Sequence, residues 1–375
     1  MERFDIIIVG SGPAGISTAL SLQKRRPDLA ARMVVVDKAV HPRHKLCGGG
    51  VTFTAHPTLE HIGIPMDSID VPQIRIDTVR IKYQDRTADV HFPDAFRTVR
   101  RNEFDAELVR RARDRGIEIR EGLAVRNVEH DDDGVVLTTE RGKLHGRVVI
   151  GADGAKSLVR RKMDLPGPSR VSRLVELLTP EDAQTTDLFQ EHTALFDFTP
   201  YDQHVQGYYW DFPSFKDGAA FMNRGIFDSR VRPERDKADI KATLSAELDK
   251  RQRPLSQFKL EGHPERWFDP AGLYANPHIF LVGDAAGVEP LLGEGIAWAL
   301  MYGPFAAEVL DDAFTRDDLS FADFGKRLAR SSLGRGLAFR TRLARFCYSR
   351  KPGFFRRFWP AIPVASRYLA WRSRG

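Results

Sequence analysis

Three glycines near the start of the chain have the spacing of a phosphate-binding turn. The segment 10–15 reads Gly-Ser-Gly-Pro-Ala-Gly and lies between an apolar run at 4–9 and a helix-forming run. Gly10 permits a tight turn, Gly12 lets a pyrophosphate approach the backbone, and Gly15 lets helix and strand pack closely. The helix start also offers free N–H groups and partial positive charge. The pattern predicts a dinucleotide site, with an ordinary glycine turn as the alternative.

An acidic residue follows at the distance expected for a ribose ligand. Asp37 ends the next apolar run, about twenty residues further on, where its carboxylate could accept hydrogen bonds from a ribose. The two runs and the helix between them form one βαβ unit. The residues assigned to the dinucleotide from this part of the chain are Gly10, Gly12, Ala14, Gly15, Asp37 and Lys38.

Two later segments carry a Gly-Asp pair directly after an apolar run. The first is 151–160, Gly-Ala-Asp-Gly-Ala-Lys-Ser-Leu-Val-Arg. The second is 283–287, Gly-Asp-Ala-Ala-Gly, followed by Pro290 and by Gly-Glu-Gly-Ile at 293–296. Taken singly, each pair is more simply explained as a surface turn. The order of the three segments along one chain is the more informative observation.

In this order the segments resemble the aromatic-hydroxylase-like branch of FAD enzymes, which includes monooxygenases, halogenases and prenyl reductases. The resemblance covers roughly residues 1–310 and implies FAD as the cofactor. It implies that Asp284 binds the ribityl and pyrophosphate region and that Asp153 bridges toward the flavin. It also directs the helix start at 293–296 to the flavin N1–C2=O edge, where reduced flavin carries negative charge. The residues assigned to FAD here are Asp153, Gly283, Asp284, Gly293, Gly295 and Ile296.

Arg101 opens the segment Arg-Asn-Glu-Phe-Asp-Ala-Glu-Leu, which is similar to the Arg-x-x-Phe-Asp-x-x-Leu segment of the same family. The resemblance implies that its guanidinium reaches the cofactor. The alternative is a solvated arginine at a helix start. The sequence has no second Gly-x-Gly-x-x-Gly segment for a nicotinamide cofactor, but in this branch such a reductant usually binds only transiently.

Two further segments resemble the geranylgeranyl reductase family. Segment 45–50, Lys-Leu-Cys-Gly-Gly-Gly, is similar to Lys-Pro-Cys-Gly-Gly-Gly, with Leu46 in place of proline. Segment 208–213, Tyr-Tyr-Trp-Asp-Phe-Pro, matches Tyr-x-Trp-x-Phe-Pro. The lysine and the later Gly-x-Gly of the family are replaced here by Ser214 and by Arg-Gly at 224–225. Halogenases of the branch carry a similar Trp-x-Trp-x-Ile-Pro segment, so the second match alone does not separate the two classes.

These segments supply candidate site residues around the flavin. Successive glycines remove side-chain bulk, so backbone can lie against the flavin and leave room for a flat substrate. Strand alternation puts Tyr208, Trp210 and Phe212 on one face, lining an apolar pocket or ordinary sheet core. Cys47 lies near the isoalloxazine ring or is a small buried thiol without a chemical task. The catalytic candidates are Cys47, Tyr208 and Trp210, with Tyr209 as a further proton donor; Gly48 and Gly49 are assigned to FAD; substrate contacts are assigned to Gly50, Tyr208, Trp210, Phe212 and Pro290.

The resemblance implies that reduced FAD saturates carbon–carbon double bonds in the prenyl chain of a geranylgeranyl-type lipid or a quinone. An external donor, such as NAD(P)H, ferredoxin or another reductase, would reduce the flavin. The alternative is an FAD-dependent monooxygenase or halogenase acting on a hydrophobic or aromatic substrate. A third reading is a flavin-binding protein that serves chiefly as a membrane-tethered partner or electron carrier.

Composition limits the other classes of protein. The 375 residues are 42% hydrophobic, enough for a packed interior in two domains. There are only two cysteines and neither a CxxC pair nor a histidine cluster at zinc spacing, so we expect a reducing cytosol, no disulfide and no structural metal. The longest uncharged apolar stretch, 296–307, falls short of the roughly 20 residues of a membrane-spanning helix.

Positive charge is concentrated at the end of the chain. The net charge is +6, yet residues 331–375 contain ten arginines, one lysine and no acidic residue. The aromatic residues interleaved with these cations are Phe339, Phe346, Phe354, Phe355, Phe358, Trp359, Tyr368 and Trp371. This combination predicts peripheral contact with the anionic inner face of the cell membrane. Helices packed on the body are the alternative, and we do not expect nucleic-acid binding.

The order of elements predicts an α/β protein. It combines a Rossmann-like FAD-binding domain with a parallel sheet, a smaller substrate domain with an antiparallel sheet, and a helical C-terminal tail. Short apolar runs that end at glycine predict the parallel strands, and aromatic, alternating runs within 170–230 predict the second sheet. The predicted boundaries are 1–71, 97–165 and 270–330 for the FAD-binding domain, 72–96 and 166–269 for the substrate domain, and 331–375 for the tail.

Overall fold

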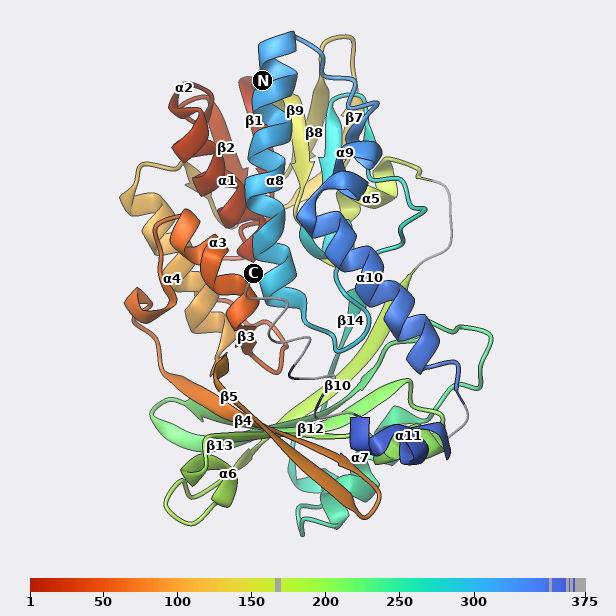
Figure 1. Ribbon diagram of the computed structural model, residues 1–375. Helices are drawn as coiled ribbons and strands as arrows, with labels where there is room; N and C mark the ends of the chain where they lie inside the picture. Colours follow the sequence, from red (N-terminus) through yellow and green to blue (C-terminus); the bar gives the residue numbers. More distant parts are fainter. Residues whose placement is uncertain (166–169, 351–352, 362–363, 365–366, 368–375) are drawn as a thin grey trace.

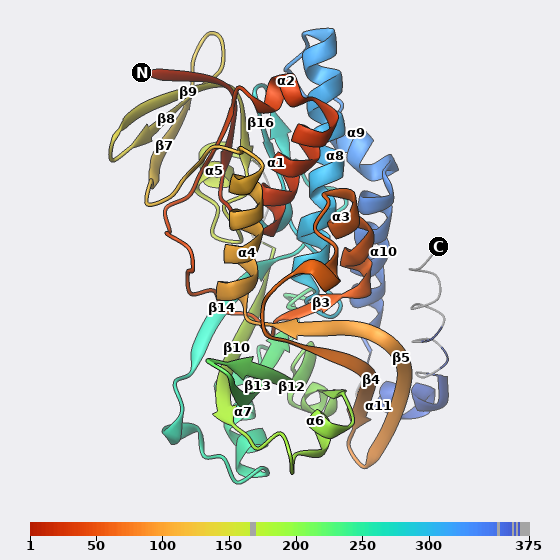
Figure 2. The same ribbon diagram turned by 90° about the vertical axis from the view of Figure 1, so that its left-hand side faces the viewer.

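The computed structural model describes residues 1–165, 170–350, 353–361, 364 and 367. Its described strands form two eight-stranded sheets. The first sheet lies in the upper half of Figures 1 and 2, surrounded by most of the helices, and the second lies in the lower half. The α/β fold class predicted from the sequence is confirmed.

The first sheet is built around short, fully buried parallel strands. Its order is β15-β16-β9-β1-β2-β6, and the β7–β8 hairpin joins it through β9. Strand β1 pairs in parallel with both β2 and β9, and Val9 stands opposite Val36 and Gly151. These three strands therefore end at one common edge. The strands are β1 (Glu2–Val9), β2 (Met33–Val36), β6 (Ile119–Arg120), β7 (Val125–His130), β8 (Val135–Thr139), β9 (Gly142–Gly151), β15 (Ala275–Asn276) and β16 (Ile279–Leu281).

Two helices pack closely together beside this sheet (Figures 1 and 2): α1 (Pro13–Arg25) and α8 (Gly295–Arg316). A Cβ added at Gly303 of α8 would lie 2.1 Å from Ser17 Oγ of α1. Ser17 Oγ instead donates a hydrogen bond to the Leu300 carbonyl oxygen at 2.7 Å. The other described α-helices are α2 (Pro27–Ala30), α3 (His56–His61), α4 (Arg101–Asp114), α5 (Leu158–Lys162), α6 (Asp187–Gln190), α7 (Ile240–Asp249), α9 (Phe324–Arg330), α10 (Ser332–Cys347) and α11 (Gly353–Phe358).

The second sheet has the order β14-β10-β13-β12-β11-β4-β5-β3. Its pairs are antiparallel except for β11 with β4, which is parallel. The predicted domain boundaries stay a prediction, with one difference: the strand Gly50–Thr52, assigned to the FAD-binding domain, pairs with β5 in this second sheet. The strands are β3 (Gly50–Thr52), β4 (Gln73–Tyr83), β5 (Arg86–Val99), β10 (Val171–Pro180), β11 (Thr193–Asp197), β12 (Gly207–Lys216), β13 (Ala219–Asp228) and β14 (Glu261–Arg266).

The described part of the basic tail lies against the body of the protein. Helix α10 buries Leu337 and Ala344, and the Tyr348 hydroxyl after it donates to the Leu291 carbonyl oxygen at 2.6 Å. The alternative of helices packed on the body therefore describes this segment. The hydrogen bond from Tyr348 places the end of α10 next to the loop that leads into α8.

The tail continues to pack through its aromatic rings. The Phe355 ring centroid lies 4.7 Å from that of Tyr201, and Trp359 is buried beside Tyr83. No helix in the described ranges combines the length and the apolar character needed to cross a bilayer. The tail aromatics whose side chains lie outside the described part of the chain are Phe354, Phe358, Tyr368 and Trp371.

Candidate active site

A cavity of about 830 Å³ is lined by residues from both sheets. It lies where β1, β2 and β9 end and where one face of the second sheet begins. Gly15, Gly283 and Pro290 do not line it. The predicted site residues that the structure brings together in its lining are Gly10, Gly12, Ala14, Asp37, Lys38, Cys47, Gly48, Gly49, Gly50, Arg101, Asp153, Tyr208, Trp210, Phe212, Asp284, Gly293, Gly295 and Ile296.

The first glycine turn is shaped by close backbone contacts. Gly10 has φ +111°, and a Cβ there would lie 2.4 Å from the Ala152 carbonyl oxygen. A Cβ at Gly15 would lie 1.9 Å from the Gly10 carbonyl oxygen, so Gly15 serves packing rather than the cavity. Gly12 is the open position: a Cβ there would meet only Arg43 Nη2, at 3.5 Å. The start of α1 is therefore accessible to a phosphate, as the pattern predicts.

Asp37 orders this turn and also lines the cavity. Its Oδ2 accepts hydrogen bonds from Ser11 N at 2.8 Å and Ser11 Oγ at 2.7 Å. Its Oδ1 accepts a hydrogen bond from Ala39 N at 2.8 Å. The carboxylate is thus fixed at the carboxyl end of β2, the position that suits a ribose hydroxyl. Lys38 beside it is exposed.

The two Gly-Asp segments reach the same cavity from neighbouring strands. Asp153 Oδ2 accepts the Leu158 N–H at 2.6 Å, whereas its Oδ1 is buried with no hydrogen-bond partner among the described residues. Burial raises the pKa of Asp153. Asp284 lines the cavity, while Gly283 packs away from it, since a Cβ there would lie 2.6 Å from Ala14 Cβ.

The loop 289–294 presents the start of α8 to the cavity. The buried Glu289 carboxylate accepts the N–H of Leu291 at 2.7 Å and those of Leu292 and Glu294 at 2.9 Å. This turn brings residues 292–296 into the lining and leaves Pro290 buried outside it, so the cavity gives the predicted substrate contact at Pro290 no support and it stays a prediction. Sequence spacing gave no sign of that orientation, because it depends on where the Glu289 side chain folds back.

These groups fit a flavin dinucleotide. Two helix starts offer N–H groups for a pyrophosphate and for an electron-rich ring edge. Carboxylates at three strand ends offer acceptors for ribose and ribityl hydroxyls, and one of them, Asp153, keeps a buried oxygen without a partner in the described structure. The residues that would hold FAD therefore come from the ends of β1, β2, β9 and β16 together.

Arg101 is buried rather than solvated. Its Nε and Nη2 donate to the two oxygens of Asp105 at 2.7 and 2.8 Å, and Arg43 Nη2 donates to the same carboxylate at 2.9 Å. Asp105 is fully buried. One carboxylate thus fixes two guanidinium groups at the cavity wall, and the alternative of a solvated arginine is excluded.

The face of the second sheet forms an aromatic wall. The structure places Tyr208, Trp210 and Phe212 on one face of β12, and all three line the cavity. Their rings meet others from β5 and β11: Phe96 lies 5.4 Å from Phe212, and Phe196 lies 4.9 Å from Tyr208, centroid to centroid. Apolar walls of this kind suit a hydrophobic ligand.

Hydrogen bonds fix two of these rings in place. Trp210 Nε1 donates to Asn223 Oδ1 at 2.8 Å, and the Tyr208 hydroxyl donates to the Leu292 carbonyl oxygen. Tyr209 points to the opposite face of the sheet, where Arg251 lies 4.2 Å from its ring centroid. Tyr209 does not line the cavity, so its position gives the predicted role of proton donor no support.

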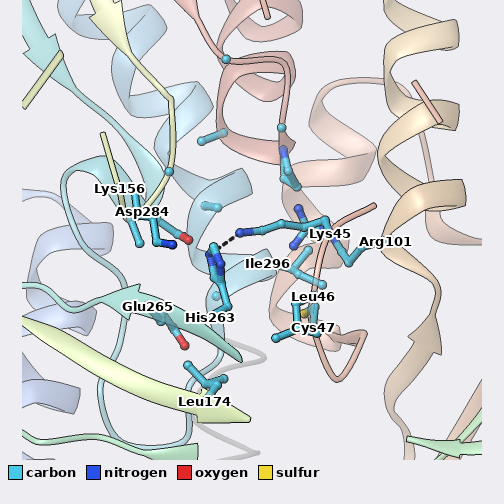
Figure 3. A pocket seen from close by; sticks show the side chains of 18 of the residues that line it. Lys45, Leu46, Cys47, Arg101, Lys156, Leu174, His263, Glu265, Asp284 and Ile296 are labelled. Atoms are coloured by element: carbon cyan, nitrogen blue, oxygen red, sulfur yellow. Dashed lines mark hydrogen bonds between the residues drawn. The ribbon is translucent and has the colours of Figure 1, made fainter. Parts of the chain in front are cut away.

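Sequence reasoning missed several ionisable side chains in the cavity. They are Lys45, His263, Glu265 and Glu176. Figure 3 shows Lys45 on one wall beside the predicted Cys47 and Arg101, and His263 and Glu265 on the other beside the predicted Asp284. The Lys45 Nζ and His263 Nε2 atoms are 2.5 Å apart and join the walls. Glu176 on β10 lines the cavity as well. The available signal was an acidic residue in an otherwise apolar strand, Leu-Val-Glu-Leu-Leu at 174–178.

The structure also bears on the predicted thiol. Cys47 lines the cavity, and its Sγ accepts a hydrogen bond from the Gly49 N–H at 3.4 Å. Burial raises the pKa of Cys47, and the Arg101 charge only partly opposes this. Cys47 is therefore held as a neutral thiol at neutral pH.

A second group of ionisable side chains, from the turn between β7 and β8 and from β9, lies outside the cavity. Asp131, Asp133 and His145 hold ligand-type atoms within 4.8 Å of one another. His145 Nε2 already lies 3.2 and 3.0 Å from the two carboxylates, and Arg3 is paired with Asp133 at 3.0 Å. The cluster is explained by these hydrogen bonds and by the Arg3–Asp133 ion pair.

The sequence of this chain is similar to a family model and to reductases of known name. Residues 3–301 match the family model of the FAD binding domain. The chain is 30% identical to digeranylgeranylglycerophospholipid reductase 2 of Methanopyrus kandleri, over 87% of this chain and 81% of the relative. It is 29% identical to menaquinone reductase of Mycolicibacterium smegmatis, over 91% of this chain and 84% of the relative.

Solved structures agree on the fold. A geranylgeranyl bacteriochlorophyll reductase-like protein of Thermoplasma acidophilum superposes with TM-score 0.76 at 21% identity, covering 94% of this chain and 90% of that one. The p-nitrophenol 4-monooxygenase of Pseudomonas putida superposes with TM-score 0.73 at 20% identity, covering 100% and 98%. The FAD cofactor and the oxidoreductase class inferred from the motifs are confirmed. The chain belongs to the geranylgeranyl reductase family of FAD-dependent oxidoreductases.

Proposed function

We propose that this protein reduces carbon–carbon double bonds in the prenyl chain of a lipid or a quinone. The observation that carries the proposal is one cavity that joins the dinucleotide-binding turns to an aromatic wall formed by Tyr208, Trp210 and Phe212. An extended hydrocarbon chain needs such an apolar surface, with few polar groups to orient it. The names of the menaquinone and digeranylgeranylglycerophospholipid reductases support this substrate class.

In this proposal the first-sheet edge binds the cofactor. FAD, when bound and reduced, supplies a hydride to the substrate. The N–H groups at the starts of α1 and α8 would hold its phosphates and its N1–C2=O edge, and Asp37, Asp153 and Asp284 would accept hydrogen bonds from its hydroxyl groups. Gly48 and Gly49 let the 45–50 segment lie close to the ring system.

The second sheet aligns the alkene and excludes water. Isolated alkenes are weak hydride acceptors, so positioning, desolvation and protonation must act together. The Trp210–Asn223 and Tyr208–Leu292 hydrogen bonds hold both rings in fixed orientations. Cys47, beside them, is a neutral thiol that contacts the substrate region rather than a nucleophile.

The same cavity would also serve an FAD-dependent monooxygenase or halogenase, whose fold this chain shares. Tyrosine at position 208 and the Cys-Gly-Gly-Gly segment at 47–50 favour the reductase. The chemical difference is whether the double bond or molecular oxygen takes the electrons of the reduced flavin. NAD(P)H, a ferredoxin or another reductase serves as the external donor in either case.

The test is anaerobic. Purified enzyme is photoreduced, mixed with a geranylgeranyl lipid or a menaquinone, and followed by flavin absorbance and by product mass. The proposal expects flavin reoxidation and a mass gain of two hydrogens per reduced bond. Reoxidation and product formation only after oxygen is admitted would overturn it in favour of the monooxygenase. No product under either condition would favour an electron-carrier role.

Membrane contact belongs to the same proposal, because a prenyl lipid must be collected from a bilayer. Helix α10 turns Arg335, Phe339, Arg342 and Phe346 outward at successive helical spacings. The two phenylalanines are 44% and 47% exposed. Exposed rings flanked by arginines suit the headgroup region of an anionic membrane.

A further inference from the structure

Glu176 lies on the same sheet face as the aromatic wall. It is 4% exposed and stands opposite Gly225 on β13 and Glu261 on β14. Trp210 is the cross-strand partner of Gly225 on the other side, and a Cβ at Gly225 would lie 2.4 Å from the Trp210 ring. The missing side chain at Gly225 therefore lets the indole lie across β13 toward Glu176.

Backbone contacts hold one oxygen of this carboxyl group and leave the other available. Glu176 Oε1 accepts the Cys47 N–H at 3.0 Å. Glu176 Oε2 is buried and has no hydrogen-bond partner among the described residues. The Asn223 amide, which binds Trp210, also donates to the Cys47 carbonyl oxygen at 3.3 Å. Glu176, Cys47 and Trp210 are thus fixed relative to one another at the cavity surface.

Most other polar groups at this end of the cavity are already engaged. Glu289 accepts three backbone N–H groups, and the Tyr208 hydroxyl donates to the Leu292 carbonyl. Glu294 accepts from Thr52, Thr54 and Trp298 Nε1. Glu265, like Glu176, has one buried carboxyl oxygen that lacks a hydrogen-bond partner in the described structure. Its Oε2 lies near Gly293 and its Oε1 near Gly295, at the turn that leads into α8.

We propose that Glu176 is the acid that protonates the substrate carbon during double-bond reduction, a role that rests on the proposed reductase function. The π bond of the alkene breaks and two C–H bonds form. One carbon receives the hydride and its electron pair from reduced FAD, which becomes oxidised, and the other carbon receives the proton from Glu176 Oε2. The carboxylate that remains is reprotonated from water before the next turnover.

The electrostatic surroundings suit this role. Burial raises the pKa of Glu176 to about 7; the Cys47 N–H, the Arg100 charge and the nearby Asn223 amide oppose this, and Glu261 adds to it. An acid with a pKa near the working pH is protonated often enough to donate and acidic enough to release the proton. Burial, with the nearby Asp284 and Glu289 carboxylates, raises the pKa of Glu265 well above its usual range. The other ionisable groups around this end of the cavity are Lys45, Arg101, Glu261, His263 and Glu265.

The first test compares Glu176→Gln with the wild type in the anaerobic reoxidation by a prenyl substrate. We expect the hydrogen-transfer rate to fall by about 100-fold or more, with flavin binding and photoreduction unchanged. The wild-type rate should fall as pH rises through about 7, because the protonated form is the active one. The rate of Glu176→Gln should not show this fall with pH. Glu176→Asp should recover part of the wild-type rate and should again show the fall with pH.

Glu261→Gln is the matched control on the adjacent strand. Its carboxylate raises the pKa of Glu176, so its removal should move the pH midpoint slightly lower without abolishing the fall with pH. Loss of the fall with pH in Glu265→Gln but not in Glu176→Gln would overturn the proposal in favour of Glu265. A normal rate and pH profile in Glu176→Gln would overturn the assignment while leaving the reductase function intact.

A second readout does not depend on turnover. In the FAD-loaded enzyme without substrate, infrared difference spectra should show a carboxylic acid C=O band that titrates with a midpoint near pH 7 and is absent from Glu176→Gln. A wild type that shows no such band overturns the assignment. A wild type that shows the band but never reoxidises with prenyl substrates overturns the reductase function and, with it, this role of Glu176.

Discussion

The two halves of the cavity are built by different means. The first-sheet half uses backbone: glycine turns after β1, β9 and β16 place N–H groups and strand-end carboxylates at one edge. The second-sheet half uses side chains from β10 and β12 that meet only across the strands, as Glu176 and Trp210 do over Gly225 of β13. Sites built from backbone groups follow local sequence patterns, whereas contacts between side chains on neighbouring strands depend on strand register. The following experiments should separate the two halves.

The largest effect is expected at Gly10. Replacing Gly10 with valine should abolish FAD retention and weaken FAD binding by at least about 100-fold, because φ is +111° and a Cβ would lie 2.4 Å from the Ala152 carbonyl oxygen. Flavin absorbance of the purified protein and fluorescence titration with FAD measure it. Gly142→Ala is the control, since Gly142 has φ +115° with nothing within 4 Å. Equal FAD loss in both variants would mean that backbone strain, and not the cofactor turn, is responsible.

A smaller and more selective effect is expected at Gly225. A Cβ at Gly225 would lie 2.4 Å from the Trp210 ring and 2.4 Å from the Val175 carbonyl oxygen, so Gly225→Ala should displace the ring and the adjoining backbone of β10. We expect it to lower kcat/KM for a prenyl substrate by roughly 10-fold to 100-fold, while FAD stays bound. Gly262→Ala on β14 is the control, because its nearest neighbour would be the Leu174 carbonyl oxygen at 3.4 Å. Loss of FAD together with activity in Gly225→Ala would contradict the separation of the two halves.

The buried acid of the second half should also appear in the stability curve. The folded pKa of Glu176 is raised by burial from 4.5 to about 7, so its contribution to stability is full below 4.5 and is lost as pH rises to about 7. Relative to Glu176→Gln, the wild type should lose roughly 1–3 kcal/mol of unfolding free energy over that window. Urea unfolding at several pH values tests this, and a constant difference would show that the carboxyl titrates normally.

The smallest effect is expected on the outer face of α10, which belongs to neither half of the cavity. Phe339→Ser with Phe346→Ser should reduce sedimentation with anionic phospholipid vesicles by about two- to tenfold and leave FAD binding unchanged. Leu273→Ser, at another exposed apolar side chain, is the control. Point changes are preferable to deletion of the tail, because Leu337 and Ala344 are buried in the body. Equal sedimentation of the double variant and the wild type would end the membrane proposal.

The sequence was most informative where chemistry lies in short segments. The glycine turns, Asp37, Asp284 and the alternation of aromatic residues on β12 are all visible as spacing, and the structure brings them into one cavity. The sequence was less informative about side chains whose burial and orientation decide whether they reach the cavity. Pro290 lies outside the cavity lining, and Tyr209 faces away from the cavity. The pairing of Gly50 with β5, which makes it part of the second sheet, could not be predicted from the sequence around Gly50.

The sequence by itself determined the cofactor and the family, and it predicted the edge where FAD would bind, because phosphate turns require particular residue types at fixed spacing. Tertiary structure alone decided which ionisable groups share that site. Glu176, Glu265 and His263 lie on β10 and β14, far along the chain from the first glycine turn. The register between these two strands, and not their distance in sequence, sets how far apart the three side chains are. The pKa of such a carboxyl depends on burial, which exists only after the sheets have assembled.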